Sequence, residues 1–162
     1  MAGTASKNHF QLSAFTAQLP DVSKKSAKIA QLLAGNSGRG FDPHYSGFFD
    51  CFNRRMHYEA HDVLEELWLE TDGPLHSFYK GLIQLAGAFV HLKKSKLNPA
   101  ARLFRLALKN LEPHAPETEG LDVATLVKRI RGWLAELEDS DYTHNPYDAH
   151  HPPQLHLEDK SQ

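Results

Sequence analysis

The sequence of 162 residues contains one cysteine, Cys51, so no disulfide can form within the chain, and this fits a reducing compartment. Long apolar runs are also missing. The longest, from Gly81 to Leu92, is interrupted by Gln84 and His91 and falls short of the roughly 18 residues that a membrane helix needs. The first residues lack the basic start, apolar block and cleavage site of a secretory signal. We therefore expect a cytoplasmic protein with no membrane partner.

A strong net charge is absent as well. The chain has 18 Lys and Arg residues against 20 Asp and Glu residues, and its formal net charge is −2. A balance of this kind gives no overall field that would attract nucleic acid. We expect no nucleic-acid partner, while a homodimer or a protein partner stays open. No strand-like alternation and no convincing internal repeat is found.

Helical periodicity is what the sequence does contain. The start signals are Pro43 in a first turn, Asn98 as an N-cap before a proline, and Asp122 as an N-cap. The fold class predicted is all-α, a compact bundle of about five to six helices in antiparallel hairpins with flexible N- and C-terminal tails. The predicted helices cover residues 23–34, 42–54, 57–70, 75–94, 98–111 and 122–137.

The composition divides the chain into three parts. Residues 1–40 form an N-terminal extension with one short helix, residues 41–138 form the helical domain, and residues 139–162 form a tail rich in histidine and proline. Low hydrophobicity predicts disorder in the tail, and its histidines are more typical of a solvated segment than of a specific metal site.

A candidate polar site lies in the predicted helix 57–70. At 100° per residue, Glu59, Asp62 and Glu66 share a sector that we expect to face solvent. His61 and Glu65 instead fall between apolar neighbours, so we expect them to be at least partly buried and to need partners. These neighbours are Tyr58, Leu69 and Trp68.

The predicted helix 75–94 is apolar over most of its circumference, which is typical of a helix in the middle of a bundle. Its remaining sector contains Gln84 and His91, bordered by Gly81 and Ala88. In one interpretation this sector meets water. In the other, the small residues let another helix approach closely, and Gln84 and His91 face it as the partners of His61 and Glu65.

Three blocks of the sequence resemble the family known as domain of unknown function 309. They are Phe52-Asn53, then Glu59-Ala-His-Asp-Val-Leu-Glu-Glu-Leu-Trp68, then Gly81-Leu-Ile-Gln-Leu-Ala-Gly-Ala-Phe-Val-His91. Asp62 departs from the usual Glu but keeps the charge, and a further block reads Pro99-Ala-Ala101 where Gly-Ala is common. The resemblance covers residues 41–111. It implies a compact all-helical fold and no established activity.

The sequence leaves three functions open for the site of His61, Glu65, Gln84 and His91. The site has a structural or ligand-binding role, it catalyses a metal-dependent, hydrolase-like reaction, or it belongs to a helical protein-interaction module. In the metal alternative, a His/Glu pair four residues apart gives a divalent metal two ligands and His91 a third, and His61 and Glu65 are also the catalytic candidates. The spacing matches neither the His-Glu-x-x-His zinc motif nor the repeated Glu-x-x-His of di-iron bundles. The residues expected to line the site are Tyr58, Glu59, Trp68 and Gln84.

Overall fold

The computed structural model describes residues 22–36 and 40–159. This part of the chain forms six α-helices, so the predicted all-α class and helix number are confirmed. The helices are α2 (Val22–Leu33), α3 (Pro43–Asn53), α4 (His57–Glu70), α5 (Pro74–Lys93), α6 (Leu97–Leu111) and α7 (Val123–Asp139). The predicted extension lies outside the described residues as far as residue 21.

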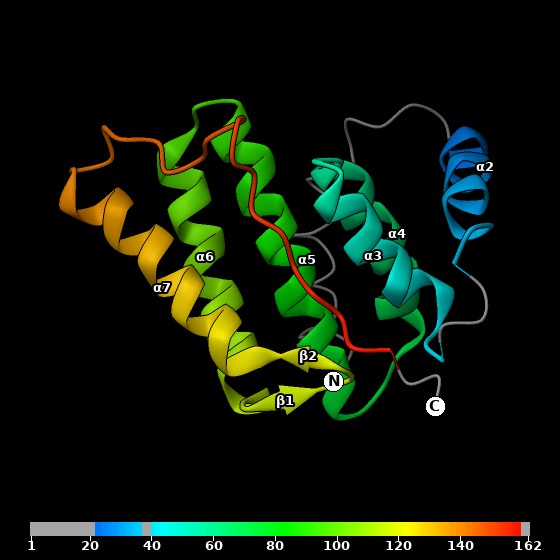
Figure 1. The fold of residues 1–162 in the computed structure, drawn as a ribbon. Coiled ribbons are helices and arrows are strands. Elements are labelled where there is room, and N and C mark those ends of the chain that lie inside the picture. The colour runs from blue at the N-terminus through cyan, green and yellow to red at the C-terminus, as the bar shows by residue number, and fades with distance from the viewer. Residues whose placement is uncertain (1–21, 37–39, 160–162) are drawn as a thin grey trace, which may run out of the picture.

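The helices form antiparallel neighbours around α5 (Figure 1). The α3–α4 hairpin lies on one side of α5, α6 and α7 lie on the other, and α2 lies at the outer edge beside α4. This central place of α5 agrees with its apolar circumference. Within the described ranges, no helix has both the length and the apolar character needed to cross a membrane.

Phe89 on α5 lies at the centre of an aromatic cluster. Its ring is fully buried, and each of its ring neighbours comes from a different segment of the chain. The neighbours and the distances between ring centroids are Phe52 (5.4 Å), His57 (5.2 Å), Phe104 (5.6 Å), Trp133 (4.9 Å) and Tyr147 (6.1 Å).

Two of the three predicted helix starts are confirmed. The side chain of Asp42, the residue before Pro43, accepts a hydrogen bond from the His44 N–H. The Asp122 side chain accepts one from the Thr125 N–H. The predicted N-cap at Asn98 is wrong by two residues, because α6 begins at Leu97 with Lys96 in the N-cap position and no side-chain cap.

The reason lies at the end of α5. Ser95 has a positive φ of 56°, and the Lys96 N–H donates to the His91 carbonyl, so the chain turns sharply and enters α6 at once. Pro99 still falls in the first turn, where its missing N–H costs nothing.

The predicted loop 113–120 contains regular structure. A short 3₁₀ turn (Glu112–His114) precedes strands β1 (Glu117–Thr118) and β2 (Leu121–Asp122), which pair antiparallel. Glu119 and Gly120 both have positive φ, as a two-residue hairpin turn requires. The expectation of no strands was wrong here because two-residue strands are too short to show alternation.

The disorder predicted for residues 139–162 is also wrong over its described part. Residues 140–159, which we name the strap, run from the end of α7 across α5 to the hairpin (Figure 1). Leu155 and Leu157 are buried, and Asn145 Nδ2 donates to the Leu92 carbonyl at 2.7 Å. The predicted boundary therefore marks the end of α7 but not the end of the packed structure. The average hydrophobicity of residues 139–162 is low, and it does not reveal that Leu155 and Leu157 are placed where they can be buried.

Candidate functional site

The structure brings His61 and Glu65 together in a buried position on α4. Their exposed fractions are 1% and 7%. The distance from His61 Nε2 to Glu65 Oε2 is 3.7 Å, and His61 Nδ1 lies 3.2 Å from Asp62 Oδ1. The burial predicted from the angular position of the pair is confirmed, and an imidazole lies between two carboxylates.

Asp62 does not face solvent as its angular position predicted. It is 7% exposed, because α2 covers this side of α4. Lys25 on α2 places its Nζ 3.6 Å from Asp62 Oδ1 and 3.5 Å from Glu65 Oε1. Nearby, Lys28 forms an ion pair of 3.0 Å with Glu59. The basic face of α2 therefore compensates the acidic face of α4.

Trp68 continues the same face of α4, one turn beyond Glu65. Its indole is 3% exposed and stacks on His76 of α5, with ring centroids 4.9 Å apart and planes inclined by 27°. The Trp68 Nε1 atom and the Glu65 Oε2 atom are both buried, and neither has a hydrogen-bond partner among the residues that the structure describes. The face thus contains one unsatisfied donor and one unsatisfied acceptor.

Tyr58 lies at the edge of this cluster, with its ring centroid 6.2 Å from that of His61. Burial raises the pKa of its hydroxyl above the ordinary value, and the negative charges of Asp62, Glu65 and Glu59 raise it further. Tyr58 therefore keeps its proton at neutral pH.

Gln84 is directed to a different neighbour from the one predicted. It is 3% exposed, and its Oε1 accepts a hydrogen bond of 2.7 Å from Asn110 Nδ2 on α6. The close approach at the small residues of α5 is real, because a Cβ added to Gly81 would lie 2.7 Å from Leu111 Cγ. The helix that approaches there is α6, so Gln84 joins α5 to α6.

His91 is half-buried near the end of α5. Burial lowers the pKa of its imidazole, and the positive charges of Lys96 and Lys94 lower it further. Within residues 22–36 and 40–159, no three His, Cys, Asp or Glu side chains are grouped to hold a metal ion. A metal held by His61, Glu65 and His91 stays a prediction.

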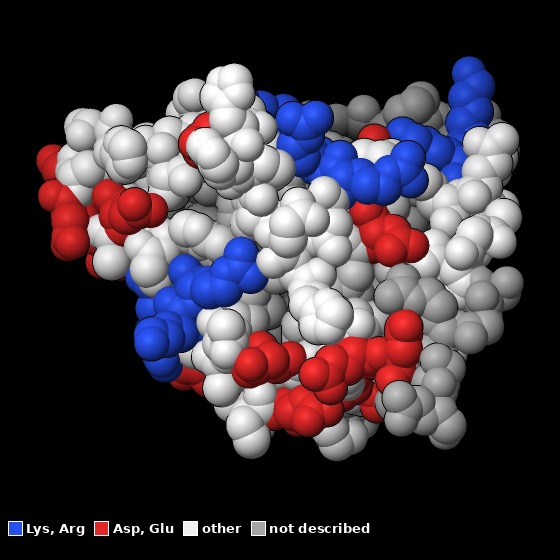
Figure 2. Space-filling view, viewed as in Figure 1, with Lys and Arg blue, Asp and Glu red and all other residues white. Residues whose placement is uncertain are grey.

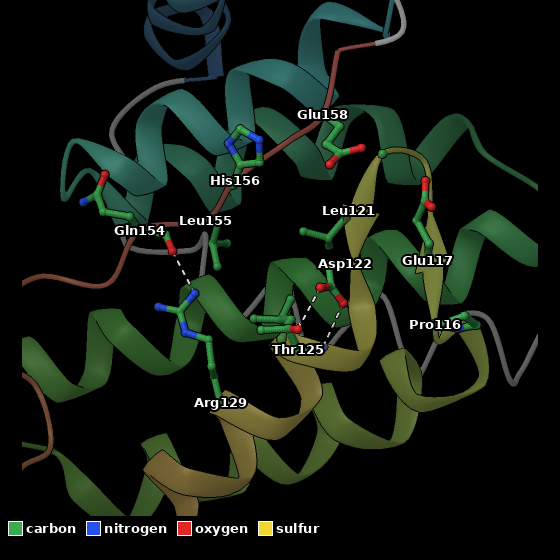
Figure 3. Close-up of a pocket in the computed structure, with 12 residues that line it drawn as sticks. Pro116, Glu117, Leu121, Asp122, Thr125, Arg129, Gln154, Leu155, His156 and Glu158 are labelled. Atoms are coloured by element: carbon green, nitrogen blue, oxygen red, sulfur yellow. Dashed lines mark hydrogen bonds between the residues drawn. The ribbon is translucent and has the colours of Figure 1, made fainter.

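Sequence reasoning missed the cavities that border the strap. One of about 550 Å³ lies between the hairpin, the start of α7 and the strap, and Asp122, Thr125 and Arg129 line it (Figure 3). Another of about 500 Å³ lies beside Trp133 and Pro146. No sequence pattern indicates these cavities, because they depend on where the strap lies.

A third cavity, of about 600 Å³, is lined by Arg54, Arg55 and Lys93 together with strap residues. Lys and Arg side chains gather at this end of the molecule, where α3 and α5 end, while Asp and Glu gather at the opposite end (Figure 2). Cations at helix C-termini interact favourably with the helix dipole. We therefore attribute this basic cluster first to helix stability.

Comparison with known proteins agrees with the resemblance seen in the sequence. Residues 45–103 match the family model described as "Domain of unknown function (DUF309)". The chain is also 31% identical over 87 residues to the "Uncharacterized protein YpuF" of Bacillus subtilis (strain 168). That alignment covers 52% of this chain and 50% of the relative, so the chain spans about half the length of that protein. No solved structure matches.

Proposed function

Residues 45–103 match the DUF309 family model, and we propose that this protein binds a small polar ligand on the α4 face of His61, Glu65 and Trp68. The family description names no activity, so the proposal depends on the site itself. The observation that supports it is the pair of buried polar atoms, Glu65 Oε2 and Trp68 Nε1, without hydrogen-bond partners in the described part of the chain.

Such atoms are costly in a folded protein. Each buried polar group without a partner destabilises the fold by about 1–3 kcal/mol, and native structures contain few of them. Residues three apart on a helix share one face, so Glu65 and Trp68 lie on the same side of α4. A ligand with a donor beside an acceptor, such as a primary carboxamide, would satisfy both atoms.

The surroundings hold both groups in place. Lys25 contacts the other carboxylate oxygen of Glu65, and His76 stacks on the Trp68 indole. These contacts fix the positions of the two side chains, and a preorganised site loses less entropy on binding. The 3.7 Å between His61 Nε2 and Glu65 Oε2 is too long for a hydrogen bond but short enough for one ligand atom to contact both.

A structural role is the second candidate. Lys25 bridges Asp62 and Glu65 and so joins α2 to α4, which favours a cluster that only fixes packing. For the metal-dependent enzyme and the interaction module, this site offers no comparable observation within the described residues. Those two alternatives, the cytoplasmic location and the homodimer stay predictions.

The test is thermal denaturation of the full chain with a panel of primary carboxamides. We expect at least one compound to raise the Tm of the wild-type protein, because a ligand that binds only the folded state stabilises it. Glu65→Gln and Trp68→Phe are expected to abolish that shift. The matched controls are Glu70→Gln, an exposed position on the same helix, and Trp133→Phe, the other tryptophan.

A structural cluster gives a different pattern. Glu65→Gln would then lower the Tm by the same amount with and without each compound, and no compound would shift the wild-type protein. This result, or a shift that survives in Trp68→Phe, contradicts the proposal.

A further inference from the structure

Asn53, from the Phe-Asn pair of the family pattern, binds the strap. Its side-chain Nδ2 donates to the Leu155 carbonyl at 2.8 Å, and the Leu155 N–H donates to its Oδ1 at 2.7 Å. The Asn53 carbonyl also accepts a hydrogen bond from Gln154 Nε2. The two bonds to Leu155 involve only backbone atoms of the strap, so the same contact is available to any extended peptide with a non-proline residue at that position.

Two residues further on, the strap pairs with the hairpin. Leu157 forms an antiparallel bridge with Leu121 of β2, and the Glu158 N–H donates to the Gly120 carbonyl at 2.9 Å. The segment therefore adds to the edge of the small sheet, as peptides do when they bind by strand addition.

The side chains of this segment alternate between the core and solvent. Leu155 is 4% exposed and Leu157 is 5% exposed, whereas Gln154, His156 and Glu158 are exposed. This period of two is that of an extended strand with one buried face. The groove thus selects apolar side chains at two positions separated by one residue.

Besides its points of attachment, such as the Asn145 hydrogen bond to Leu92 and the Tyr147 ring in the cluster around Phe89, the strap adjoins cavities. Each of the three cavities described above has strap residues in its wall, and together they border the strap along most of its length. Near the groove, Arg129 Nη1 on α7 donates a hydrogen bond of 2.8 Å to the Gln154 carbonyl (Figure 3). A segment bordered by cavities has fewer packing contacts to lose when it opens, and this lowers the free-energy cost of opening.

We propose that the groove formed by Asn53, the Gly120–Leu121 edge and the start of α7 is a receptor for an extended partner segment of the pattern Leu-x-Leu. In the absence of the partner, the chain's own residues 154–158 occupy it. The occupant is inferred from what fits there now: a backbone bound by Asn53, two buried leucines, and polar residues outward. This inference uses none of the residues of the proposed carboxamide site, so the result of either test does not affect the other proposal.

The test uses the full chain with its own segment weakened by Leu155→Ala and Leu157→Ala. A fluorescent peptide of residues 153–159 is titrated, and binding is followed by anisotropy. We expect this opened variant to bind the peptide at least about tenfold more tightly than wild type, in which the tethered segment competes at high effective concentration. Adding Asn53→Ala to the opened variant removes two hydrogen bonds and is expected to weaken binding about tenfold or more.

Two controls accompany the titration. A peptide with alanine at both leucine positions is expected not to bind, and circular dichroism verifies that the opened variant keeps its helices. If that variant fails to fold, the same question is asked of wild type by hydrogen exchange. Excess wild-type peptide is then expected to speed exchange of the Leu155 and Glu158 amides while the amides of α5 stay protected.

Three results would overturn the proposal. The first is that the opened variant folds but does not bind the peptide. Where hydrogen exchange is the measurement, the equivalent result is that the peptide leaves exchange of the wild-type Leu155 and Glu158 amides unchanged. The second is equal binding with and without Asn53. The third is a wild-type dimer that dissociates in the opened variant, because a second copy of the chain would then supply the segment.

Discussion

Gly81 is a residue of α5 at which α6 approaches closely. A Cβ there would lie 2.7 Å from Leu111 Cγ and 3.2 Å from Asn110 Cβ. We predict that Gly81→Ala lowers the free energy of unfolding by about 1–3 kcal/mol, as overpacking does. Urea denaturation measures it. The control is Gly132→Ala on α7, where a Cβ meets open space and helix propensity predicts a gain of up to about 1 kcal/mol. Equal effects of both changes would contradict the role of the close approach.

His57 makes stability depend on pH. Burial and then the charge of Lys93, whose Nζ lies 3.2 Å from Nδ1, lower the pKa of His57 to about 3. In the unfolded chain a histidine titrates near pH 6.5, so below that pH the unfolded state takes up a proton that the folded state refuses. The contribution of neutral His57 is therefore complete above pH 6.5 and is lost as the pH falls toward 3.

The matching variant is His57→Phe, which keeps a ring against Phe89. We predict that wild type loses about 2 kcal/mol more of its unfolding free energy between pH 7 and pH 5 than this variant does. Urea denaturation at the two pH values measures the difference. Parallel losses in the two proteins would show that His57 takes up its proton in the folded state as well.

At the scale of residues, the sequence predicts the burial of His61 and Glu65 correctly but does not predict the contact that buries Asp62. The 100° spacing on α4 predicts the burial of His61 and Glu65 because apolar neighbours flank them on the same helix. It fails for Asp62, because the shielding comes from Lys25, 37 positions earlier in the chain, and spacing within one helix contains no information about it.

At the scale of elements, α2 tests how much charge compensation contributes to docking. Lys25 contacts both Asp62 and Glu65, while Lys24 next to it is exposed. We predict that Lys25→Glu places like charges together and speeds hydrogen exchange of the α2 amides, with α5 unchanged. Lys24→Glu changes the net charge equally and is expected to leave α2 protected. Equal exchange in the two variants would mean that apolar packing, such as that of the buried Ile29, suffices to dock α2.

Helix positions are predictable because their signals are local. Asp42, just before Pro43, and Asp122 each accept a hydrogen bond from an N–H group in the first turn, and the structure confirms both starts. The start at Leu97 depends on the turn at Ser95, and the binding of the strap depends on Asn53, about a hundred residues away in the sequence. Signals of that kind are not visible in a window of neighbouring residues.

For the whole molecule, Cys51 offers a measure of opening. Its thiol is 2% exposed, and burial, followed by the charge of Glu59, raises its pKa to about 11. Since the thiolate is the reactive form, we predict slow reaction with a disulfide reagent at pH 8 and immediate reaction in strong denaturant. The labelling rate is expected to rise in Gly81→Ala as its stability falls. Rapid labelling of the folded wild type would contradict this.

The fold class follows from one property of the sequence, the nearly complete apolar circumference of residues 74–93, which requires neighbours on most sides. The place of the strap does not follow, because Leu155 and Leu157 are two apolar residues within a polar segment. Their burial depends on a groove that exists only after the helices have packed.

The aromatic cluster around Phe89 also limits how this sequence can change over time. Its five ring neighbours come from α3, α4, α6, α7 and the strap, so each ring fits a space shaped by the other segments. A change of size at Phe104 is tolerated best when Trp133 changes in compensation. We expect positions 52, 104 and 133 to vary together among related sequences, and a protein designed on this scaffold to need all of them redesigned at once.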